Sequence, residues 1–207
     1  AVVMRGAGDK AFVSGADISE FESTRSSAES IATYEKTIKL ANEALRSLEK
    51  PLIAMIRGYC LGGGLAISLS ADLRISSEDA QFSIPAARLG LGYGAAGIKE
   101  LMTIIGPSFA KEIFFTGRRF KAYEALEMGL VNRVVPNEEL MSTTLKLTDA
   151  IAQNAPLTIK ASKATVNEML KDSSEQDLDK VNNMVEKCFS SEDYIQGRRA
   201  FMEKRLP

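Results

Sequence analysis

The chain has no histidine among its 207 residues, so the side chain most often used for proton transfer is absent. This excludes Ser-His-Asp and Cys-His hydrolases, zinc enzymes with the HExxH motif and every His-based proton relay. The two cysteines, Cys60 and Cys188, are too few for a disulfide framework and argue against a structural zinc site. They predict a reducing, intracellular location. Any acid–base chemistry must therefore use Asp, Glu, Tyr, Lys or water.

Neither sign of charge is in excess, and no long apolar run is present. The 26 Lys and Arg residues are interspersed with 27 Asp and Glu residues, for a net charge of -1. No block of like charge indicates a nucleic-acid partner or an anionic membrane surface. Without an 18-residue apolar run or a signal peptide, we expect no membrane span. The length fits one large domain, alone or with a helical appendage.

The periodicity of the apolar residues predicts short β-α units up to residue 136 and helices from there to the end. Strands are expected at 1–4, 12–18, 52–56, 73–76, 80–83 and 131–135. Helices are expected at 27–48, 63–71, 98–105, 108–115, 122–128, 138–154, 157–171 and 175–189. The chain starts inside a strand and without methionine, so we expect that residues preceding it are missing.

Three consecutive glycines, Gly62, Gly63 and Gly64, stand between a buried strand and a helix. Without a Cβ, they leave backbone N–H groups open to a ligand, and a helix N-terminus favours negative charge. Residues 14–17, Ser-Gly-Ala-Asp, form a second turn of this kind. Two such turns can direct two N–H groups at one carbonyl oxygen, as an oxyanion hole. Each turn alone is equally explained as a tight connection between packed elements.

In this order, the motifs resemble those of the crotonase superfamily, the enoyl-CoA hydratase/isomerase family. The matching segments are AFVSGADI at 11–18, PLIA at 51–54, GYCLGGG at 58–64, ADLR at 71–74, AQF at 80–82, LG at 89–90, FTG at 115–117 and the stretch 125–135. The resemblance implies an α/β fold, a crotonase-like ββα spiral with a helical C-terminal region. Residues 1–136 would form the core, lacking its N-terminal strands, and 137–207 a trimerisation region of a homotrimer or homohexamer.

The resemblance also implies an acyl-CoA thioester as substrate and no cofactor other than the coenzyme A of that substrate. The backbone amides of Ala16 and Gly63 would form the oxyanion hole, while Asp17 and Asp72 match structural positions. Phe201 and Lys204, one turn apart on a helix, would contact the adenine and phosphate of coenzyme A, or form an ordinary surface pair. The location implied is the cytoplasm, or the mitochondrial matrix or a peroxisome in a eukaryote. The implied substrate contacts are Ser14, Asp17, Ile18, Gly62, Ala66, Pro85, Ala86, Leu89, Phe201 and Lys204.

The chain departs from the family pattern where hydratases carry two glutamates, because these positions hold Ala66 and Ala86. A third carboxylate position, used by related isomerases and dehalogenases, holds Gly94. Tyr93 matches a tyrosine of methylmalonyl-CoA decarboxylases and would act as proton donor, or only pack under its loop. Three functions stay open: an enoyl-CoA hydratase or isomerase, a methylmalonyl-CoA-type decarboxylase, and a non-catalytic acyl-CoA binder.

Overall fold

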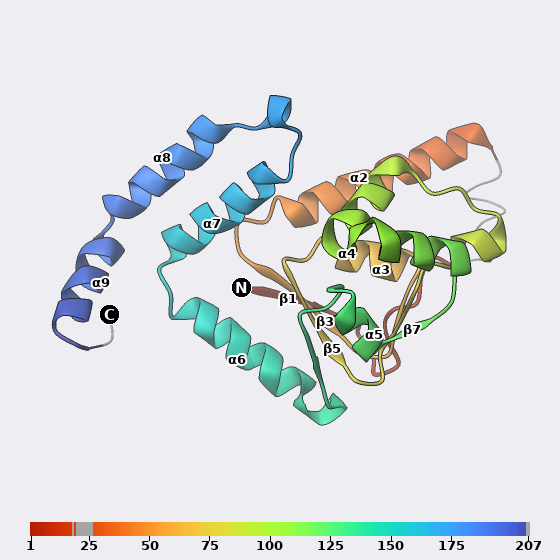
Figure 1. The fold of residues 1–207 in the computed structure, drawn as a ribbon, viewed down its shortest axis with the longest axis horizontal. Coiled ribbons are helices and arrows are strands. Elements are labelled where there is room, and N and C mark those ends of the chain that lie inside the picture. Colours follow the sequence, from red (N-terminus) through yellow and green to blue (C-terminus); the bar gives the residue numbers. More distant parts are fainter. Residues whose placement is uncertain (18, 20–26, 206–207) are drawn as a thin grey trace. The chain divides into compact units, whose positions relative to one another are not determined.

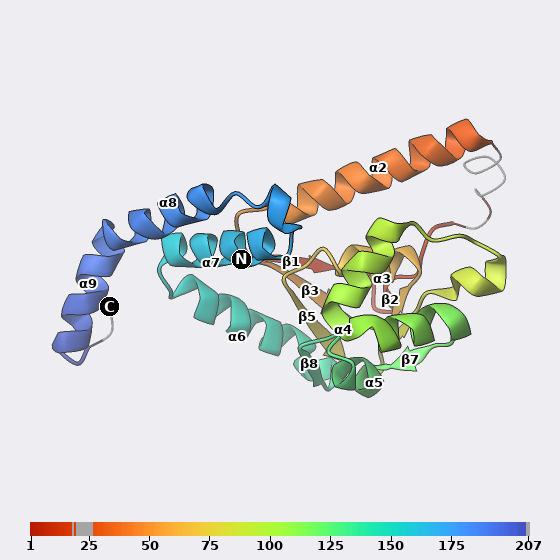
Figure 2. The same cartoon turned by 45° about the horizontal axis from the view of Figure 1, so that its top comes forward.

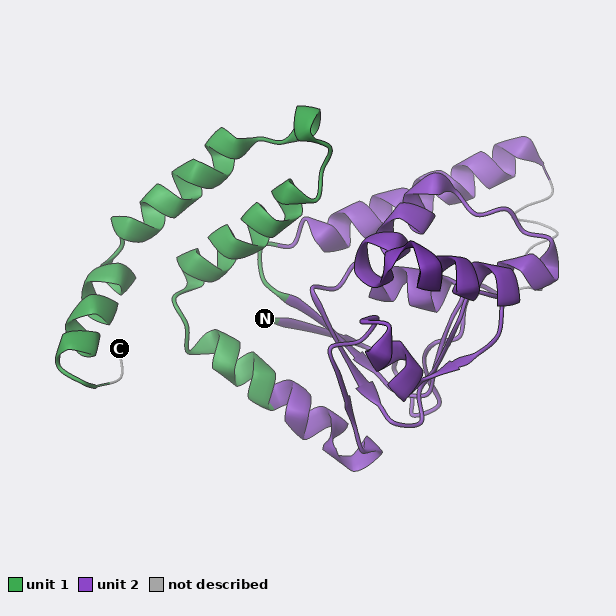
Figure 3. Ribbon diagram, in the orientation of Figure 1, with its two compact units in different colours: residues 1, 49–51, 146–207 green, residues 2–48, 52–145 purple. Residues whose placement is uncertain are grey.

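The structure is a computed structural model that describes residues 1–17, 19 and 27–205. It divides into two compact units (Figure 3). The part that we call the first unit is purple in Figure 3, where the key labels it unit 2, and comprises Val2–Leu48 and Leu52–Leu145. The part that we call the second unit is green, labelled unit 1 in the key, and comprises Lys146–Pro207 with Ala1 and Glu49–Pro51. The domain boundary predicted at residue 136, between a core and a helical trimerisation region, stays a prediction.

The strands of the first unit form two sheets of four strands each (Figure 1). One sheet is parallel throughout, in the order β1 (Val2–Arg5), β3 (Leu52–Ile56), β5 (Leu73–Ser77) and β8 (Arg133–Val135). In the other, β2 (Ala11–Val13), β4 (Tyr59–Leu61) and β6 (Gln81–Ser83) are parallel, and β7 (Phe120–Lys121) is antiparallel to β6. The first six strands alternate between the sheets, so each β-β pair before a helix contributes one strand to each.

The helices of the first unit follow the predicted pattern, with corrected bounds. Among the described residues they include α2 (Ala28–Arg46), α3 (Gly63–Ser68), α4 (Ala95–Thr116), α5 (Ala122–Glu127) and the start of α6 (Leu140–Ala152), with 3-10 turns at Pro85–Leu89 and Asn137–Glu139. Ser27 caps α2 by accepting a hydrogen bond from the amide of Ser30. The two helices expected at 98–105 and 108–115 are the halves of α4, which is kinked at Gly106 with φ +76° before Pro107.

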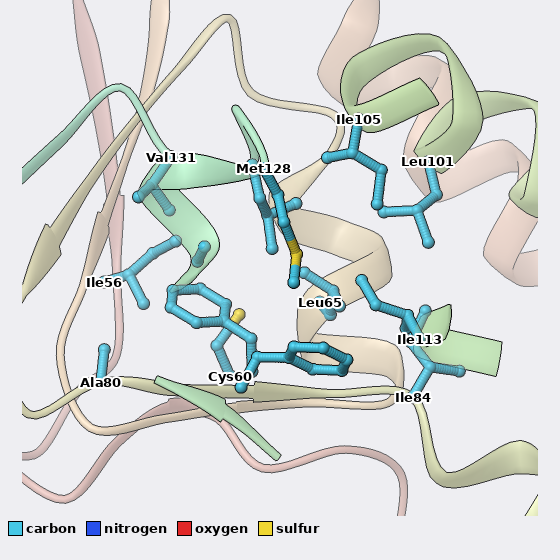
Figure 4. Packing of buried hydrophobic residues seen from close by; sticks show 14 of the residues in the cluster. Ile56, Cys60, Leu65, Ala80, Ile84, Leu101, Ile105, Ile113, Met128 and Val131 are labelled. Carbon is cyan, nitrogen blue, oxygen red and sulfur yellow. The ribbon is translucent and has the colours of Figure 1, made fainter. Parts of the chain in front are cut away.

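The core of the first unit is apolar and closely packed (Figure 4). All five residues of β3 are buried, as expected of a central strand in a parallel sheet. Cys60 on β4, Leu65 on α3 and Ile113 on α4 are fully buried in one cluster. This packing fixes α3 over the strands that precede the two predicted turns.

The second unit is helical, as predicted for this part of the chain. It contains the end of α6 (Leu140–Ala152), then α7 (Pro156–Met169), a 3-10 turn at Ser173–Glu175, α8 (Leu178–Phe189) and α9 (Glu192–Met202). α7 and α8 lie side by side, which Figures 1 and 2 show from two directions. The buried carboxylate of Glu168 joins them by accepting hydrogen bonds from Lys171 Nζ at 2.7 Å and the Asp177 amide at 2.7 Å. No described helix combines the length and the apolar character needed to cross a membrane.

Candidate functional site

The two predicted turns leave neighbouring parallel strands at the same edge of one sheet. β2 pairs with β4 in the register Ala11 with Tyr59 and Val13 with Cys60. Because both strands run in the same direction, the segments that follow them leave the sheet together. A Cβ built on Gly63 lies 3.9 Å from the amide nitrogen of Ala16, and one built on Gly15 lies 3.3 Å from the carbonyl oxygen of Leu61.

The amide nitrogens of Ala16 and Gly63 lie near each other where the two turns meet. A Cβ lies about 2.5 Å from its own amide nitrogen, so with the 3.9 Å contact the two nitrogens are at most about 6.4 Å apart. Two donors that each bind one oxygen at about 2.7–3.1 Å lie up to about 6 Å apart. Both residues are exposed. The geometry thus permits an oxyanion hole, and that role stays a prediction.

Neither amide donates a hydrogen bond to an acceptor in the described part of the chain. Gly63 is the first residue of α3, where an N–H group has no intrahelical acceptor. No described residue accepts a hydrogen bond from Gly63 or Ala16. The amide of Gly62, in contrast, donates to the carbonyl oxygen of Ser83 at 2.7 Å. Gly62 has φ +53°, a conformation that favours glycine, and so serves the turn itself.

Gly64 has a role that the sequence reasoning missed. A Cβ at this position would lie 2.0 Å from the carbonyl oxygen of Val13 and 2.9 Å from its Cβ. α3 and β2 therefore approach so closely that only glycine fits between them. The sequence reasoning related the triplet to the approach of a ligand, whereas Gly64 allows two segments of the protein itself to meet.

The side chains at the two expected glutamate positions are methyl groups that cannot transfer protons. Ala66 is half-buried on α3, and Ala86 is buried in the 3-10 turn Pro85–Leu89. Pro85 is half-buried at the start of that turn, and Leu89 at its end is 51% exposed. Ser14 is exposed after β2, whereas Ile18 lies outside the described residues. Their predicted substrate contacts stay predictions.

Tyr93 is packed against α4 by two contacts. Its ring centroid lies 4.9 Å from that of Phe114, with the planes tilted by 58°. A Cβ built on Gly97 would lie 2.7 Å from Tyr93 Cε1, so the ring also lies directly over that glycine. These contacts give Tyr93 a packing role, and the proton-donor role stays a prediction.

Asp17 and Asp72 make contacts typical of structural residues. The carboxylate of Asp17 accepts hydrogen bonds from Ser19 Oγ at 2.6 Å and the Ser19 amide at 2.9 Å, which lower the pKa of Asp17. Asp72 Oδ2 accepts from the amide of Leu52 at 2.6 Å, at the start of β3. Both carboxylates are thus engaged in local structure.

Phe201 and Lys204 lie at the end of the second unit. The expectation that they share a helix is wrong, because α9 ends at Met202. Lys204 has φ +52°, and the Arg205 amide bonds to the carbonyl oxygen of Ala200 at 3.0 Å, which closes the helix with a left-handed turn. Phe201 is 83% exposed and lines a groove of about 830 Å³ formed by α7, α8 and α9. Their contact with coenzyme A stays a prediction.

The described residues contain neither a reactive buried thiol nor a metal-binding cluster. Cys60 is fully buried, and burial raises its pKa to about 12, so the thiolate required of a nucleophile is disfavoured. No group of three or more Cys, Asp and Glu side chains in the described ranges could hold a metal ion.

Comparison with known proteins gives consistent matches over the whole chain. The family model for enoyl-CoA hydratase/isomerase matches residues 1–207. A short-chain-enoyl-CoA hydratase from Clostridium acetobutylicum is 39% identical over 208 residues, which cover 99% of this chain and 78% of that protein. A carnitinyl-CoA dehydratase from Proteus mirabilis is 40% identical over 167 residues, 79% of this chain and 64% of that protein. The solved structure of an enoyl-CoA hydratase from Bacillus anthracis matches with a TM-score of 0.86 at 35% identity, covering 100% of this chain and 79% of that one. The predicted α/β fold, a ββα spiral with a helical C-terminal region, is confirmed.

Proposed function

Because the chain belongs to the enoyl-CoA hydratase/isomerase family, the crotonase superfamily, we propose that it stabilises the enolate of an acyl-CoA thioester. The donors are the backbone amides of Ala16 and Gly63. Two observations support this proposal. A Cβ built on Gly63 lies 3.9 Å from the Ala16 nitrogen, and neither amide donates a hydrogen bond to an acceptor in the described part of the chain. Coenzyme A enters as part of the substrate, and no other cofactor is proposed.

The chemistry suits a site built from main-chain donors. When a charge develops next to a thioester carbonyl, it moves onto the carbonyl oxygen, where two fixed N–H groups stabilise it. Loss of one such donor typically raises the barrier by about 3 kcal/mol. Backbone donors do not depend on the side chains at 66 and 86, so this function is compatible with Ala66 and Ala86.

A matched pair of substitutions at Gly63 tests the donor role. Proline is tolerated at the first position of a helix, so Gly63→Pro deletes this N–H with little cost to α3. Gly63→Ala keeps the N–H, and its Cβ meets nothing closer than 3.9 Å. The probes are butyryl-CoA and S-butyl-CoA, a thioether of the same length without the carbonyl oxygen.

We expect the wild type to bind butyryl-CoA more tightly than S-butyl-CoA in calorimetry. Two hydrogen bonds of about 1 kcal/mol each correspond to a preference of roughly 30-fold. Gly63→Pro reduces the preference to about 5-fold, whereas Gly63→Ala retains it. Equal binding of the two probes by the wild type argues against the oxyanion hole.

The hydratase reaction has a direct test in crotonyl-CoA. Hydration needs one group that deprotonates water and one that protonates carbon, whereas residues 66 and 86 are alanines. Turnover of crotonyl-CoA above a buffer blank supports a hydratase. Tight binding of butyryl-CoA without turnover across a panel of thioesters identifies a non-catalytic acyl-CoA binder.

Decarboxylation of a methylmalonyl-CoA-type thioester is the second candidate. The absence of carboxylates at 66, 86 and 94 favours it, because this reaction needs no strong base. The bond between the α carbon and the carboxylate breaks, and carbon dioxide leaves. The electron pair of the broken bond stays on the α carbon and forms the enolate. The Tyr93 hydroxyl then protonates the α carbon and is reprotonated from water. Tyr93→Phe should lower the rate of carbon dioxide release from methylmalonyl-CoA by about 100-fold, and an unchanged rate excludes this role.

We also propose assembly as a homotrimer or homohexamer. The support is the apolar surface of α8, where Leu178, Val185 and Phe189 are 47%, 41% and 61% exposed. Light scattering coupled to size-exclusion chromatography measures the mass of the assembly. A monomer at micromolar concentration contradicts this proposal and leaves the donor role of Gly63 to its own test.

A further inference from the structure

Arg74 on β5 is a buried cation that binds main-chain carbonyls from two different segments. Arg74 is only 6% exposed. Nε donates to the carbonyl oxygen of Leu130 at 2.7 Å, and Nη1 donates to those of Ala71 at 2.7 Å and Ser68 at 3.3 Å. Its backbone is held too, because its amide donates to Asn132 Oδ1 at 2.8 Å and its carbonyl accepts from the Asn132 amide.

The shape of the arginine side chain suits this set of bonds. The guanidinium presents several N–H donors in a rigid planar fork, whereas a lysine ammonium is a single point on a flexible stem. Burial of a charge is costly unless its hydrogen bonds are satisfied. The three carbonyl oxygens accept these bonds, and the planar guanidinium determines where each of them lies. Burial accordingly lowers the pKa of Arg74, and the nearby Asp72 opposes that change.

These bonds bear on the proposed donors because Ser68 is the last residue of α3 and Gly63 is the first. α3 is a single short rod of about 9 Å, at 1.5 Å per residue, so a displacement at one end moves the other. Gly64 packs against Val13 near the start of the helix, and Arg74 holds its end.

We propose that Arg74 is a positioning residue, which sets the place of the Gly63 amide by binding the carbonyl of Ser68, the last residue of α3, and that of Ala71 just beyond the helix. This inference rests on the proposed function and deepens it, since it names the side chain on which the geometry of the oxyanion hole depends. Arg74 touches no substrate and transfers no proton. Its effect is on the strength of the hydrogen bond from Gly63 to the thioester oxygen, which depends steeply on distance and angle.

The infrared spectrum of bound butyryl-CoA labelled with ¹³C at the carbonyl measures that hydrogen bond without requiring turnover. Polarisation of the carbonyl lowers its stretching frequency relative to butyryl-CoA in water. The variants are Arg74→Lys, which keeps the charge, and Arg74→Met, an unbranched apolar side chain that makes none of the three hydrogen bonds. Ile75→Ala is the control, because this fully buried neighbour points to the opposite face of the sheet.

We expect the wild type and Ile75→Ala to show the lowered frequency, although Ile75→Ala lowers the thermal midpoint. Arg74→Lys and Arg74→Met should bind butyryl-CoA and lose most of the frequency shift. If the Arg74→Lys protein does not fold, the Arg74→Met protein provides the test. A folded Arg74 variant with the full wild-type shift overturns the inference. A wild type without any shift contradicts the proposed oxyanion hole instead, so the two failures are distinguished.

Discussion

Gly64→Ala should separate the two proposed donors while leaving the fold intact. The added Cβ would lie 2.0 Å from the carbonyl oxygen of Val13, whereas ordinary contacts begin at 3.4 Å. The two segments must therefore move apart by about 1.4 Å to accept one methyl group. Gly63 is the preceding residue and Ala16 lies three residues beyond Val13, so this movement opens the gap between their amides.

The movement is large compared with the tolerance of a hydrogen bond. A donor at about 2.9 Å that retreats by about 1.4 Å lies beyond 4 Å, where no hydrogen bond remains. Loss of one donor corresponds to about 10²–10³-fold in the rate of an oxyanion-dependent step. Overpacking of this kind costs about 1–3 kcal/mol of stability, so the variant should fold with a lower thermal midpoint.

Calorimetry with butyryl-CoA and S-butyl-CoA tests this prediction against Gly63→Ala, which adds the same methyl group one residue earlier without a close contact. We expect Gly64→Ala to lose most of the preference for the thioester and Gly63→Ala to keep it. A folded Gly64→Ala protein with the wild-type preference would refute the argument that close packing of α3 on β2 positions the donors.

Three further predictions concern the rest of the molecule. Iodoacetamide at neutral pH should spare Cys60, whose pKa is raised to about 12, until the protein is unfolded; labelling of native Cys60 would contradict its burial. The pKa of Glu168 is lowered by hydrogen bonds from Lys171 and the Asp177 amide, so its stabilising contribution is complete above the ordinary pKa of 4.5 and is lost as pH falls through the lower folded value. Urea titrations should therefore show a smaller loss of stability on acidification for Glu168→Gln than for the wild type, and equal losses would refute this. Asp72→Ala leaves the buried Leu52 amide without its carboxylate acceptor and should cost about 1–3 kcal/mol in urea unfolding, with an unchanged midpoint as the opposing result.

Local sequence patterns were enough to predict most elements and the position of the two turns. The run from Leu52 to Ile56 is continuously apolar and is a fully buried strand. The helices expected from residues 27 and 157 begin at Ala28, capped by Ser27, and at Pro156. β4 and β7 were missed: β7 has only two residues, too few for a period to be visible, and β4 follows β3 after a two-residue connection and runs directly into the glycine triplet. The strand expected at 12–18 ends at Val13.

The contacts that shape the site could not be predicted, because they join residues far apart in the chain. The reason for a glycine at 64 is the carbonyl of Val13 on another strand. Arg74 and Leu130 are 56 residues apart, and no spacing rule connects them. The resemblance to the family supplied the donors Ala16 and Gly63, while their closeness and freedom from other bonds became visible only in the fold.

A crystal structure of the protein with butyryl-CoA bound tests the central proposal most directly. The proposal predicts the thioester oxygen within about 2.7–3.1 Å of both the Ala16 and the Gly63 amide nitrogens. A thioester oxygen that is bound elsewhere, or that reaches only one of these two nitrogens, would contradict it.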